Sequence, residues 1–256
     1  MNNLNFGLKQ KNYMKHEYAK IWTKMRKNIY AYNSYDKFLF KLIKKKNNLK
    51  EKKILEVCCG DGNPFASKLI SEKYFYKGID ISGFLINLAK KNYGDKYFDI
   101  GDAENLKFKK SMFELVFCIH SFWYISNINK TINEMTRVLK PKGYLIFDTL
   151  NSLNTQIRQN HEKVIFESKG FGKFLRYLKN LIKIISFTGY TKWSDVIHQK
   201  PNDIKKIVNL LKKNTKLKNL IIFGQQELNN KIYKLNTKKN LNFKKFKKII
   251  FQCQKI

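Results

Sequence analysis

Hydrophobic and polar positions follow different periods in different parts of the chain. Apolar side chains recur at helical spacing before residue 50, in two groups: Tyr18, Ile21, Trp22 and Met25, then Phe38, Leu39 and Leu42. A spacing of three to four residues places such side chains on one face of a helix. The first 50 residues are therefore predicted to form an N-terminal helical lid.

From residue 53, short apolar runs alternate with helical stretches. Five runs are predicted as strands, at residues 53–57, 76–81, 97–100, 115–119 and 144–148. Helices are expected between them, at residues 64–72, 84–92 and 128–139, and a Lys-Pro-Lys-Gly turn at 140–143 ends the last helix. Alternation of strands and helices at this spacing predicts βαβ units and a parallel sheet.

The rhythm breaks after residue 150. Residues 151–200 are predicted to form a substrate-cap insert over the ligand edge of the sheet, after the fifth strand. A helix at 201–211 and strands at 217–223 and 248–254 then close the fold, with the lysine-rich stretch 231–248 as a loop or short amphipathic piece. The expected fold is α/β, with a doubly wound, mostly parallel seven-stranded sheet, whose core spans residues 51–150 and 201–256.

Composition agrees with a globular protein of a reducing compartment. At 43% hydrophobic residues, the 256-residue chain can bury a full core. It has no apolar run of eighteen residues and no signal-peptide pattern, so a cytoplasmic location without a membrane span is expected. Its four cysteines form no CxxC pair, and no His and Cys spacing typical of a metal site occurs. No metal is expected.

The net charge of +33 leaves two interpretations open. A basic surface favours nucleic acid, anionic lipid or an acidic small molecule as partner. However, nearly all of the 52 basic residues are lysines, whereas phosphate-binding proteins usually favour the bidentate arginine. A lysine-rich surface can also reflect a host genome rich in A and T, so charge alone identifies no partner.

A glycine-rich turn provides the strongest chemical signal. The segment ILEVCCGDGNP, residues 54–64, runs from an apolar strand through Gly60 and Gly62 to Pro64, where a helix is expected. Glycines in such a turn let a ligand approach the backbone, at the carboxyl edge where doubly wound folds bind ligands. Acidic residues end the next two strands, at Asp80 in GIDIS and Asp102 in GDAENL. Either acid alone could be a helix cap or a solvated turn.

These features in this order resemble the class I S-adenosylmethionine-dependent methyltransferases, in particular the small-molecule group of methyltransferase type 11. Glu56, Cys58, Gly60 and Gly62 occupy the four positions of that group's ExGxGxG loop, with Cys58 in place of a glycine or alanine. The resemblance continues through FELVFCIHSFWYI and EMTRVLKPKGYLIFD. It covers residues 53–148 well and 201–255 loosely.

The resemblance implies S-adenosylmethionine as cofactor and in-line methyl transfer, which depends on alignment more than on acid–base machinery. Glu56 would act on the methionine end through the loop, and Gly60 and Gly62 would lie against it. Asp80 would bind the ribose and Asp102 the adenine. The remaining cofactor-binding candidates are the small or apolar neighbours Cys58, Ile81, Ala103 and Cys118.

The acceptor site is expected after the fourth strand, in the segment HSFWY. His120 is the candidate general base, because a neutral imidazole can take a proton near pH 7, although a core histidine is an equal alternative. Tyr18 of the lid is the second candidate. Aromatic rings can hold an ammonium group and arginines a phosphate. The candidate acceptor-binding residues are Tyr13, Trp123, Tyr124, Arg158, Arg176 and Tyr177.

A small, anionic acceptor is the preferred hypothesis, with a phosphorylated amine such as phosphoethanolamine first and a sugar or nucleotide-sugar hydroxyl second. RNA methylation is a further alternative, which the charge favours. The segment HSFWY differs, however, from the NPPY-like motif that nucleic-acid methyltransferases often carry, and no added nucleic-acid module is evident. A non-catalytic binding protein is disfavoured by the intact loop and acids.

Overall fold

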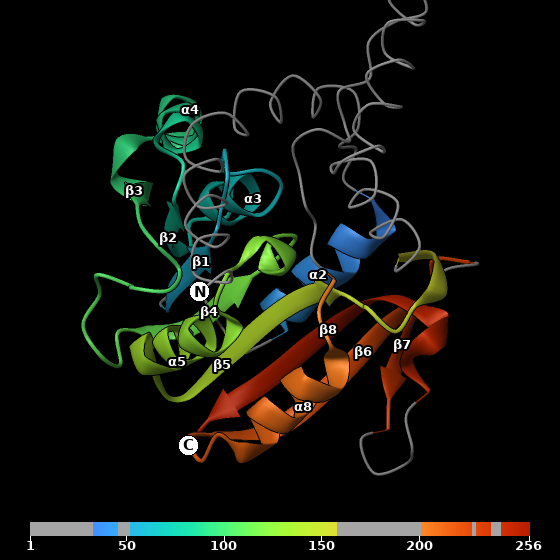
Figure 1. The fold of residues 1–256 in the computed structure, drawn as a ribbon. Coiled ribbons are helices and arrows are strands. Elements are labelled where there is room, and N and C mark those ends of the chain that lie inside the picture. The colour runs from blue at the N-terminus through green and yellow to red at the C-terminus, as the bar shows by residue number, and fades with distance from the viewer. Residues whose placement is uncertain (1–32, 46–51, 158–200, 227–228, 237–241) are drawn as a thin grey trace, which may run out of the picture.

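The computed structural model describes residues 33–45, 52–157, 201–226, 229–236 and 242–256. They form one mixed sheet in the order β3-β2-β1-β4-β5-β8-β6-β7 (Figure 1). The strands are β1 Lys53–Val57, β2 Phe75–Asp80, β3 Phe98–Ile100, β4 Phe113–Cys118, β5 Leu139–Leu150, β6 Leu217–Gln226, β7 Ile232–Leu235 and β8 Phe246–Lys255.

Strands β1 to β5 pair in parallel, whereas β8 is antiparallel to both β5 and β6. The carboxyl ends of the five parallel strands therefore share one edge of the sheet. The start of β8 reaches the same edge, where Lys248 pairs with Leu150 at the end of β5. Most of the described site residues discussed below lie at this edge.

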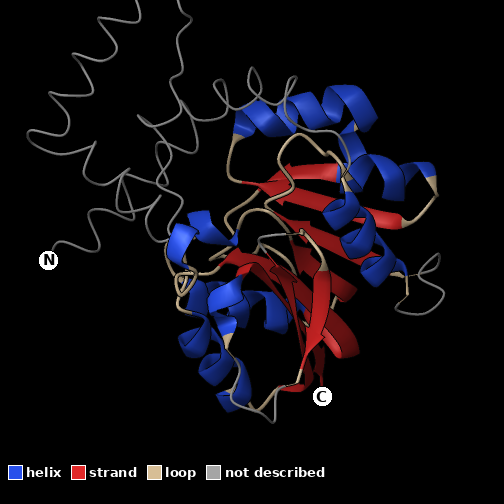
Figure 2. Cartoon of the chain, turned by 90° about the vertical axis from the view of Figure 1, so that its right-hand side faces the viewer, coloured by secondary structure: helices blue, strands red, loops and turns tan. Residues whose placement is uncertain are grey.

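Helices cover both faces of the sheet, as a doubly wound fold requires (Figure 2). They are α2 Ser34–Lys44, α3 Phe65–Ser71, α4 Gly83–Tyr93, α5 Ile128–Val138 and α8 Ile204–Lys213. Two separate hydrophobic clusters result, one beneath α2, α3 and α4 and the other beneath α5 and α8. The predicted α/β class and the alternation of strands and helices are confirmed.

The sheet has eight strands rather than the predicted seven. The additional strand is β7, which lies inside the stretch 231–248 that was expected to be a loop. Its four residues pair with the second half of β6, but they are only half-buried or exposed. So short a segment, inside a lysine-rich stretch, carries no detectable strand pattern, and the pairing depends on the neighbouring β6.

The predicted turn at 140–143 lies inside β5 rather than before it. Strand β5 begins at Leu139, opposite Phe113, and its register with β4 shifts before Tyr144 pairs with Leu115. Lys142 has a φ of 62°, and a Cβ on Gly143 would lie 2.9 Å from the carbonyl oxygen of Glu114. The Pro–Gly signal therefore marks an irregularity within a strand, which periodicity alone does not distinguish from a turn.

Helix α2 comes from the predicted lid but packs as part of the core. Asn33 caps it through bonds to the backbone N–H groups of Tyr35 and Asp36, and Leu39 and Ile43 on its inner face are fully buried. Phe38 meets Phe223 of β6 edge-on, with ring centroids 5.3 Å apart. The remainder of the lid lies outside the described residues.

The two ends of the predicted cap insert meet at the carboxyl edge of the sheet. Asn151 directly follows β5 and forms an isolated parallel bridge with Asn202. The side-chain amide of Asn202 also donates to the Thr149 hydroxyl, at 2.7 Å. Residues 158–200, which lie between these anchors, are outside the described residues. Both ends of the insert thus lie at the ligand edge.

Candidate functional site

The glycine-rich turn between β1 and α3 has left-handed backbone at three alternate positions. The φ angles are 61° at Cys58, 58° at Gly60 and 87° at Gly62. A Cβ on Gly62 would lie 2.9 Å from the ring of Tyr93, so this glycine is required by packing against α4 as well as by its backbone angle. Cys58 adopts the conformation that glycine adopts more readily, at a cost of roughly 1 kcal/mol. The cysteine thus preserves the expected loop geometry.

Asp80 joins this turn to the second strand. One carboxylate oxygen accepts from the Gly60 N–H at 3.0 Å, and the other accepts from the Ser82 N–H at 2.9 Å. Burial raises the pKa of Asp80 to about 6, although the backbone donors at Ser82 and Gly60 pull it downward. A carboxylate offers about four acceptor positions, so Asp80 retains capacity for further donors.

Glu56 is buried within the sheet and does not reach the edge by itself. The hydroxyl of Tyr76, on β2, donates to its Oε2 at 2.6 Å. Burial, followed by the charge of Glu56, raises the pKa of Tyr76 well above its ordinary value. Because Glu56 lies immediately before the turn, this contact anchors the root of the loop.

Asp102 follows β3, beside β2, and its Oδ1 accepts from the Glu104 N–H at 2.9 Å. Ile81 is half-buried and Ala103 is buried, 8% exposed. Cys118 is buried at the end of β4, where the thiol of Cys58 is its neighbour and burial raises its pKa well above the ordinary value. The predicted cofactor residues therefore follow β3, β2, β1 and β4 along one edge.

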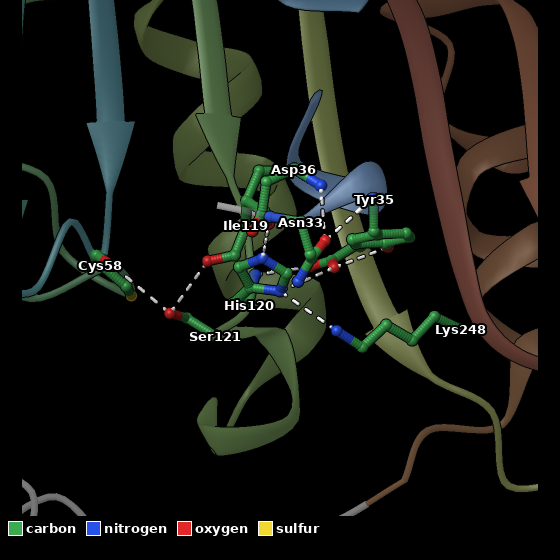
Figure 3. Close-up of polar contacts among 9 residues, drawn as sticks. Asn33, Tyr35, Asp36, Cys58, Ile119, His120, Ser121 and Lys248 are labelled. Atoms are coloured by element: carbon green, nitrogen blue, oxygen red, sulfur yellow. Dashed lines mark hydrogen bonds and ion pairs between the residues drawn. The ribbon is translucent and has the colours of Figure 1, made fainter. Parts of the chain in front are cut away.

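A buried polar cluster lies beside the turn, at the ends of β4 and β5. We call it the His120 cluster; its members are Tyr35, Asp36, His120, Asp148 and Lys248. Figure 3 labels all of them except Asp148. It joins α2 to the sheet edge. Ser121, the neighbour of His120, donates to the Cys58 carbonyl at 3.3 Å and so links the cluster to the glycine-rich turn.

Both ring nitrogens of His120 have polar partners. Nε2 lies 2.7 Å from Oδ1 of Asp36, and Nδ1 lies 3.2 Å from the Lys248 ammonium (Figure 3). A second carboxylate is close by, because Nδ1 is 3.5 Å from Oδ2 of Asp148. His120 has a left-handed φ of 59°, and its backbone N–H donates to Oδ1 of Asp148 at 2.7 Å.

The two carboxylates of the cluster are fully buried, whereas His120 and Lys248 are partly exposed. Asp148 also accepts from the Tyr35 hydroxyl at 2.8 Å. Burial lowers the pKa of Lys248, while the charges of Asp148 and Asp36 oppose that shift. Two buried acids thus lie beside His120, whose Nδ1 also contacts Lys248.

Aromatic rings surround the lysine end of this cluster. The Lys248 ammonium lies 4.6 Å from the ring centroid of Tyr35 and 5.3 Å from that of Trp123. Trp123 is buried, and its indole nitrogen has no hydrogen-bond partner among the described residues. Tyr124 stands next to it, half-buried, with ring centroids 5.8 Å apart. The predicted Trp123 therefore belongs beside the His120 cluster.

Four members of the cluster were missed from the sequence: Tyr35, Asp36, Asp148 and Lys248. Asp36 reads as an ordinary acid in the first turn of a helix, and Lys248 as one lysine in a lysine-rich stretch. Asp148, the expected end of the fifth strand, carried the one usable signal, because an acid in an apolar strand requires partners. The predicted site residues Tyr13, Tyr18, Arg158, Arg176 and Tyr177 lie outside the described residues.

The described part of the chain contains neither a metal-binding cluster nor a membrane-spanning helix. No group of three His, Cys, Asp or Glu residues there has the arrangement of a metal site. Within the same residues, no helix is long and apolar enough to cross a membrane.

Comparison with known proteins relates residues 55–147 to a family. Residues 55–147 match the family model described as "Methyltransferase domain". The chain is 31% identical over 134 residues to phthiotriol/phenolphthiotriol dimycocerosates methyltransferase 1 of Mycobacterium ulcerans, which covers 51% of the chain and 46% of that relative. It is 26% identical to the malonyl-[acyl-carrier protein] O-methyltransferase of Calditerrivibrio nitroreducens, over 67% of each. The matched segment thus spans about half of the Mycobacterium relative's length.

The fold comparison extends over nearly the whole chain. A crystal structure from Thermotoga maritima, described as a SAM-dependent methyltransferase and possible histamine N-methyltransferase, superposes with a TM-score of 0.62. It covers 95% of this chain and 100% of that one, at 16% sequence identity. At this identity the likeness concerns the fold alone. Residues 55–147 thus form a domain that is similar to those of the class I S-adenosylmethionine-dependent methyltransferases of the type 11 group.

Proposed function

We propose that the chain transfers a methyl group from S-adenosylmethionine to a nitrogen or oxygen of a small acceptor. The observation that carries this proposal is the order of groups along one sheet edge. Asp102, Asp80 and the glycine-rich turn follow three adjacent strands, and the His120 cluster comes directly after them. One side suits a nucleoside and the other suits an acceptor with an exchangeable proton.

The cofactor side fits a nucleoside by the chemistry of its donors and acceptors. Asp80 holds both carboxylate oxygens at the end of β2, and each can accept a ribose hydroxyl in addition to its backbone donor. Gly60 and Cys58 present backbone without bulky side chains. Asp102 would receive the adenine amino group, with Ile81 and Ala103 as apolar walls. When bound, S-adenosylmethionine supplies an electrophilic methyl group on a sulfonium.

The chain's own contribution is to orient the acceptor and to receive its proton. Alignment of the two reacting atoms removes much of the entropic barrier of a bimolecular reaction. In this proposal, Trp123 and Tyr35 provide ring faces for the acceptor, and His120 lies behind them. The buried surroundings exclude water, which strengthens each polar contact.

For the acceptor we propose a small anionic metabolite, with a phosphorylated amine first. The excess of 33 positive charges favours an anion, while the two carboxylates of the His120 cluster favour an amine. A phosphorylated amine carries both groups. Arg158, Arg176, Tyr177, Tyr13 and Tyr18 keep the roles predicted for them as part of this proposal.

A transfer screen with methyl-labelled S-adenosylmethionine tests the proposal. Its acceptors are phosphoethanolamine, nucleotide sugars, malonyl-[acyl-carrier protein] and total RNA. Labelled product should form with phosphoethanolamine, and Asp80→Asn should abolish it at limiting cofactor. The matched control Asp99→Asn changes an exposed acid on the adjacent strand, paired only with Lys77 among the described residues, and should keep full activity.

Salt dependence separates the small acceptors from RNA. Binding to many phosphates releases counterions together, so affinity for RNA falls steeply as salt rises, whereas KM for a small dianion changes much less. We expect the shallow dependence. Exclusive methylation of RNA with a steep salt slope would replace the small-acceptor proposal, and no transfer to any acceptor would reject methyl transfer itself.

A further inference from the structure

The hydrogen bonds of the His120 cluster indicate which of its groups carry protons. Asp148 accepts on both oxygens, from the Tyr35 hydroxyl and from the His120 backbone N–H. Asp36 accepts from the Asn33 N–H on Oδ2, and its Oδ1 lies 2.7 Å from His120 Nε2. We take Nε2 as the protonated ring nitrogen, because Nδ1 faces the Lys248 ammonium. An ionised carboxylate accepts on both oxygens, whereas a protonated one must donate from one of them. The geometry therefore describes two buried negative charges.

Among the described residues, one positive charge in the cluster balances them. Lys248 Nζ and His120 Nδ1 are 3.2 Å apart, and two N–H groups cannot donate to each other. One of the two atoms must accept, so the pair carries one cation in place of two. We assign the donor role to the Lys248 ammonium, which has three N–H groups and no lone pair, so Nδ1 accepts and the imidazole is neutral. The cluster is then one proton short of neutrality.

A proton added to Nδ1 of His120 would have a carboxylate of Asp148 close by. An imidazolium at His120 would keep its Nε2–H on Asp36 and turn its Nδ1–H toward Oδ2 of Asp148, which is 3.5 Å away. Lys248 would keep its position over the rings of Tyr35 and Trp123. Two cations would then face two carboxylates, which is the better-compensated state of a buried site.

We infer that Lys248 and His120 act as one unit that takes the proton released by the methyl acceptor, with Lys248 as the relay and His120 as the store. The inference rests on the proposed methyl transfer. It differs from a single histidine base, because both nitrogens of His120 are already occupied. Lys248, partly exposed, is the member that faces an incoming acceptor, while Asp36 and Asp148 position the pair from behind.

The proton count of the transfer closes on this unit. The lone pair of the acceptor nitrogen or oxygen forms the bond to the methyl carbon, and the carbon–sulfur bond breaks with its electrons remaining on sulfur. Lys248 first passes one of its own protons to Nδ1 of His120, which leaves a neutral amine with a lone pair. The acceptor N–H or O–H bond returns its electrons to the heteroatom as its proton passes to that lone pair. Lys248 is then an ammonium again, and the imidazolium later loses its extra proton to solvent.

Trp123 gives independent support for a ligand beside this unit. Its indole N–H is buried and has no partner among the described residues, although a buried donor normally has one. The same ring contacts both Lys248 and His120, with centroid distances of 5.3 Å and 6.3 Å. An acceptor molecule with an oxygen or nitrogen lone pair would satisfy this donor while its reacting group meets Lys248.

The first test is independent of activity and measures where the protons lie. Imidazole ¹⁵N resonances of the full chain at pH 7.5, with His120 assigned through His120→Asn, should show a proton on Nε2 and none on Nδ1. Lys248→Met should protonate Nδ1, since His120 then becomes the only cation beside two carboxylates. Lys248→Arg should leave Nδ1 of His120 without a proton. The exposed Lys245→Met, which removes the same charge nearby, should change nothing. Identical Nδ1 states in all four proteins would overturn the shared-proton inference.

The second test measures rate, using the screened acceptor that turns over. Lys248→Met should lower kcat by about 10²-fold or more, the usual scale of proton-transfer catalysis. Lys248→Arg keeps the charge but cannot give up a proton, so it should be equally slow, with unchanged affinity for S-adenosylmethionine by calorimetry. Restoration of the rate by arginine would overturn the relay. Absence of any turnover in the unmodified chain would reject the proposed function, while the ¹⁵N result would still decide the shared proton.

Discussion

The two halves of the sheet edge are built in different ways. On the proposed cofactor side, each group lies at the end of its own strand or in the loop that follows it. Its partners are local or on the adjacent strand: Gly60 with Asp80, and Asp102 with Glu104. On the acceptor side, Asp36, His120, Asp148 and Lys248 come from four distant parts of the chain. The first half depends on local backbone geometry, and the second on tertiary packing and charge balance.

The largest effect is expected when a buried charge of the acceptor side loses its partner. Asp148→Ala removes the acceptor of the Tyr35 hydroxyl and of the His120 N–H, and leaves Lys248 less compensated. Unfolding in urea should show a loss of about 3–5 kcal/mol, as for other buried pairs broken on one side.

Two further variants sharpen this result. Asp99→Ala breaks an exposed pair with Lys77 and should cost within about 1 kcal/mol. Adding Lys248→Met to Asp148→Ala should recover part of the stability, because the unbalanced cation disappears. A cost for Asp148→Ala no larger than that for Asp99→Ala would contradict the view that buried charges hold the acceptor side together.

A smaller effect is expected from the backbone of the cofactor side. Gly62→Ala places a methyl group 2.9 Å from the Tyr93 ring at a φ of 87°, so the free energy of unfolding should fall by about 1–3 kcal/mol. Gly83→Ala is the control, because that glycine has no positive φ and its neighbour is the flexible end of Ile100. Equal stability of the two variants in thermal unfolding would show that the turn tolerates a side chain.

The smallest effect is a pH dependence that separates the halves. Asp80 has its pKa raised to about 6 by burial, and an ionised carboxylate is the better acceptor for ribose hydroxyls. Affinity for S-adenosylmethionine should therefore weaken about fivefold between pH 6 and pH 5, by calorimetry. Asp80→Asn should bind weakly at both pH values, with the ratio between them close to one.

The same shift has the opposite sign for stability. A carboxyl whose folded pKa lies above its unfolded value of 3.8 binds more protons in the native state. Asp80 therefore stabilises the ligand-free fold most below pH 4, and this contribution is lost as pH rises through 6. The free energy of unfolding of the unmodified chain, relative to that of Asp80→Asn, should therefore fall as pH rises from 4 to 6. A rise over this range would contradict a buried Asp80 with a raised pKa.

Sequence patterns located the residues of the proposed cofactor side at one sheet edge, but not most of the His120 cluster, for a physical reason. Gly60, Gly62 and Asp102 lie in loops that follow their strands and Asp80 ends its strand, so the order of strands already assigns them to one edge. His120 was found in the same way, as the residue that follows the fourth strand. Its partners were not, since nothing local in the chain indicates that helix α2 packs against β4 and β5. Strand β7 was not predicted for a related reason. Its four residues are too few to show a strand pattern, and the strand depends on pairing with β6.

Calorimetric titration of S-adenosylmethionine into the full chain tests most directly the claim that this edge is a cofactor site. The unmodified chain should bind one equivalent. Asp80→Ala should weaken binding by about 1–3 kcal/mol, the scale of a lost buried hydrogen-bond acceptor, while Asp99→Ala should bind like the unmodified chain. Equal affinity of the unmodified chain and Asp80→Ala, or no binding by either, would contradict the assignment of the glycine-rich turn and Asp80 to the cofactor.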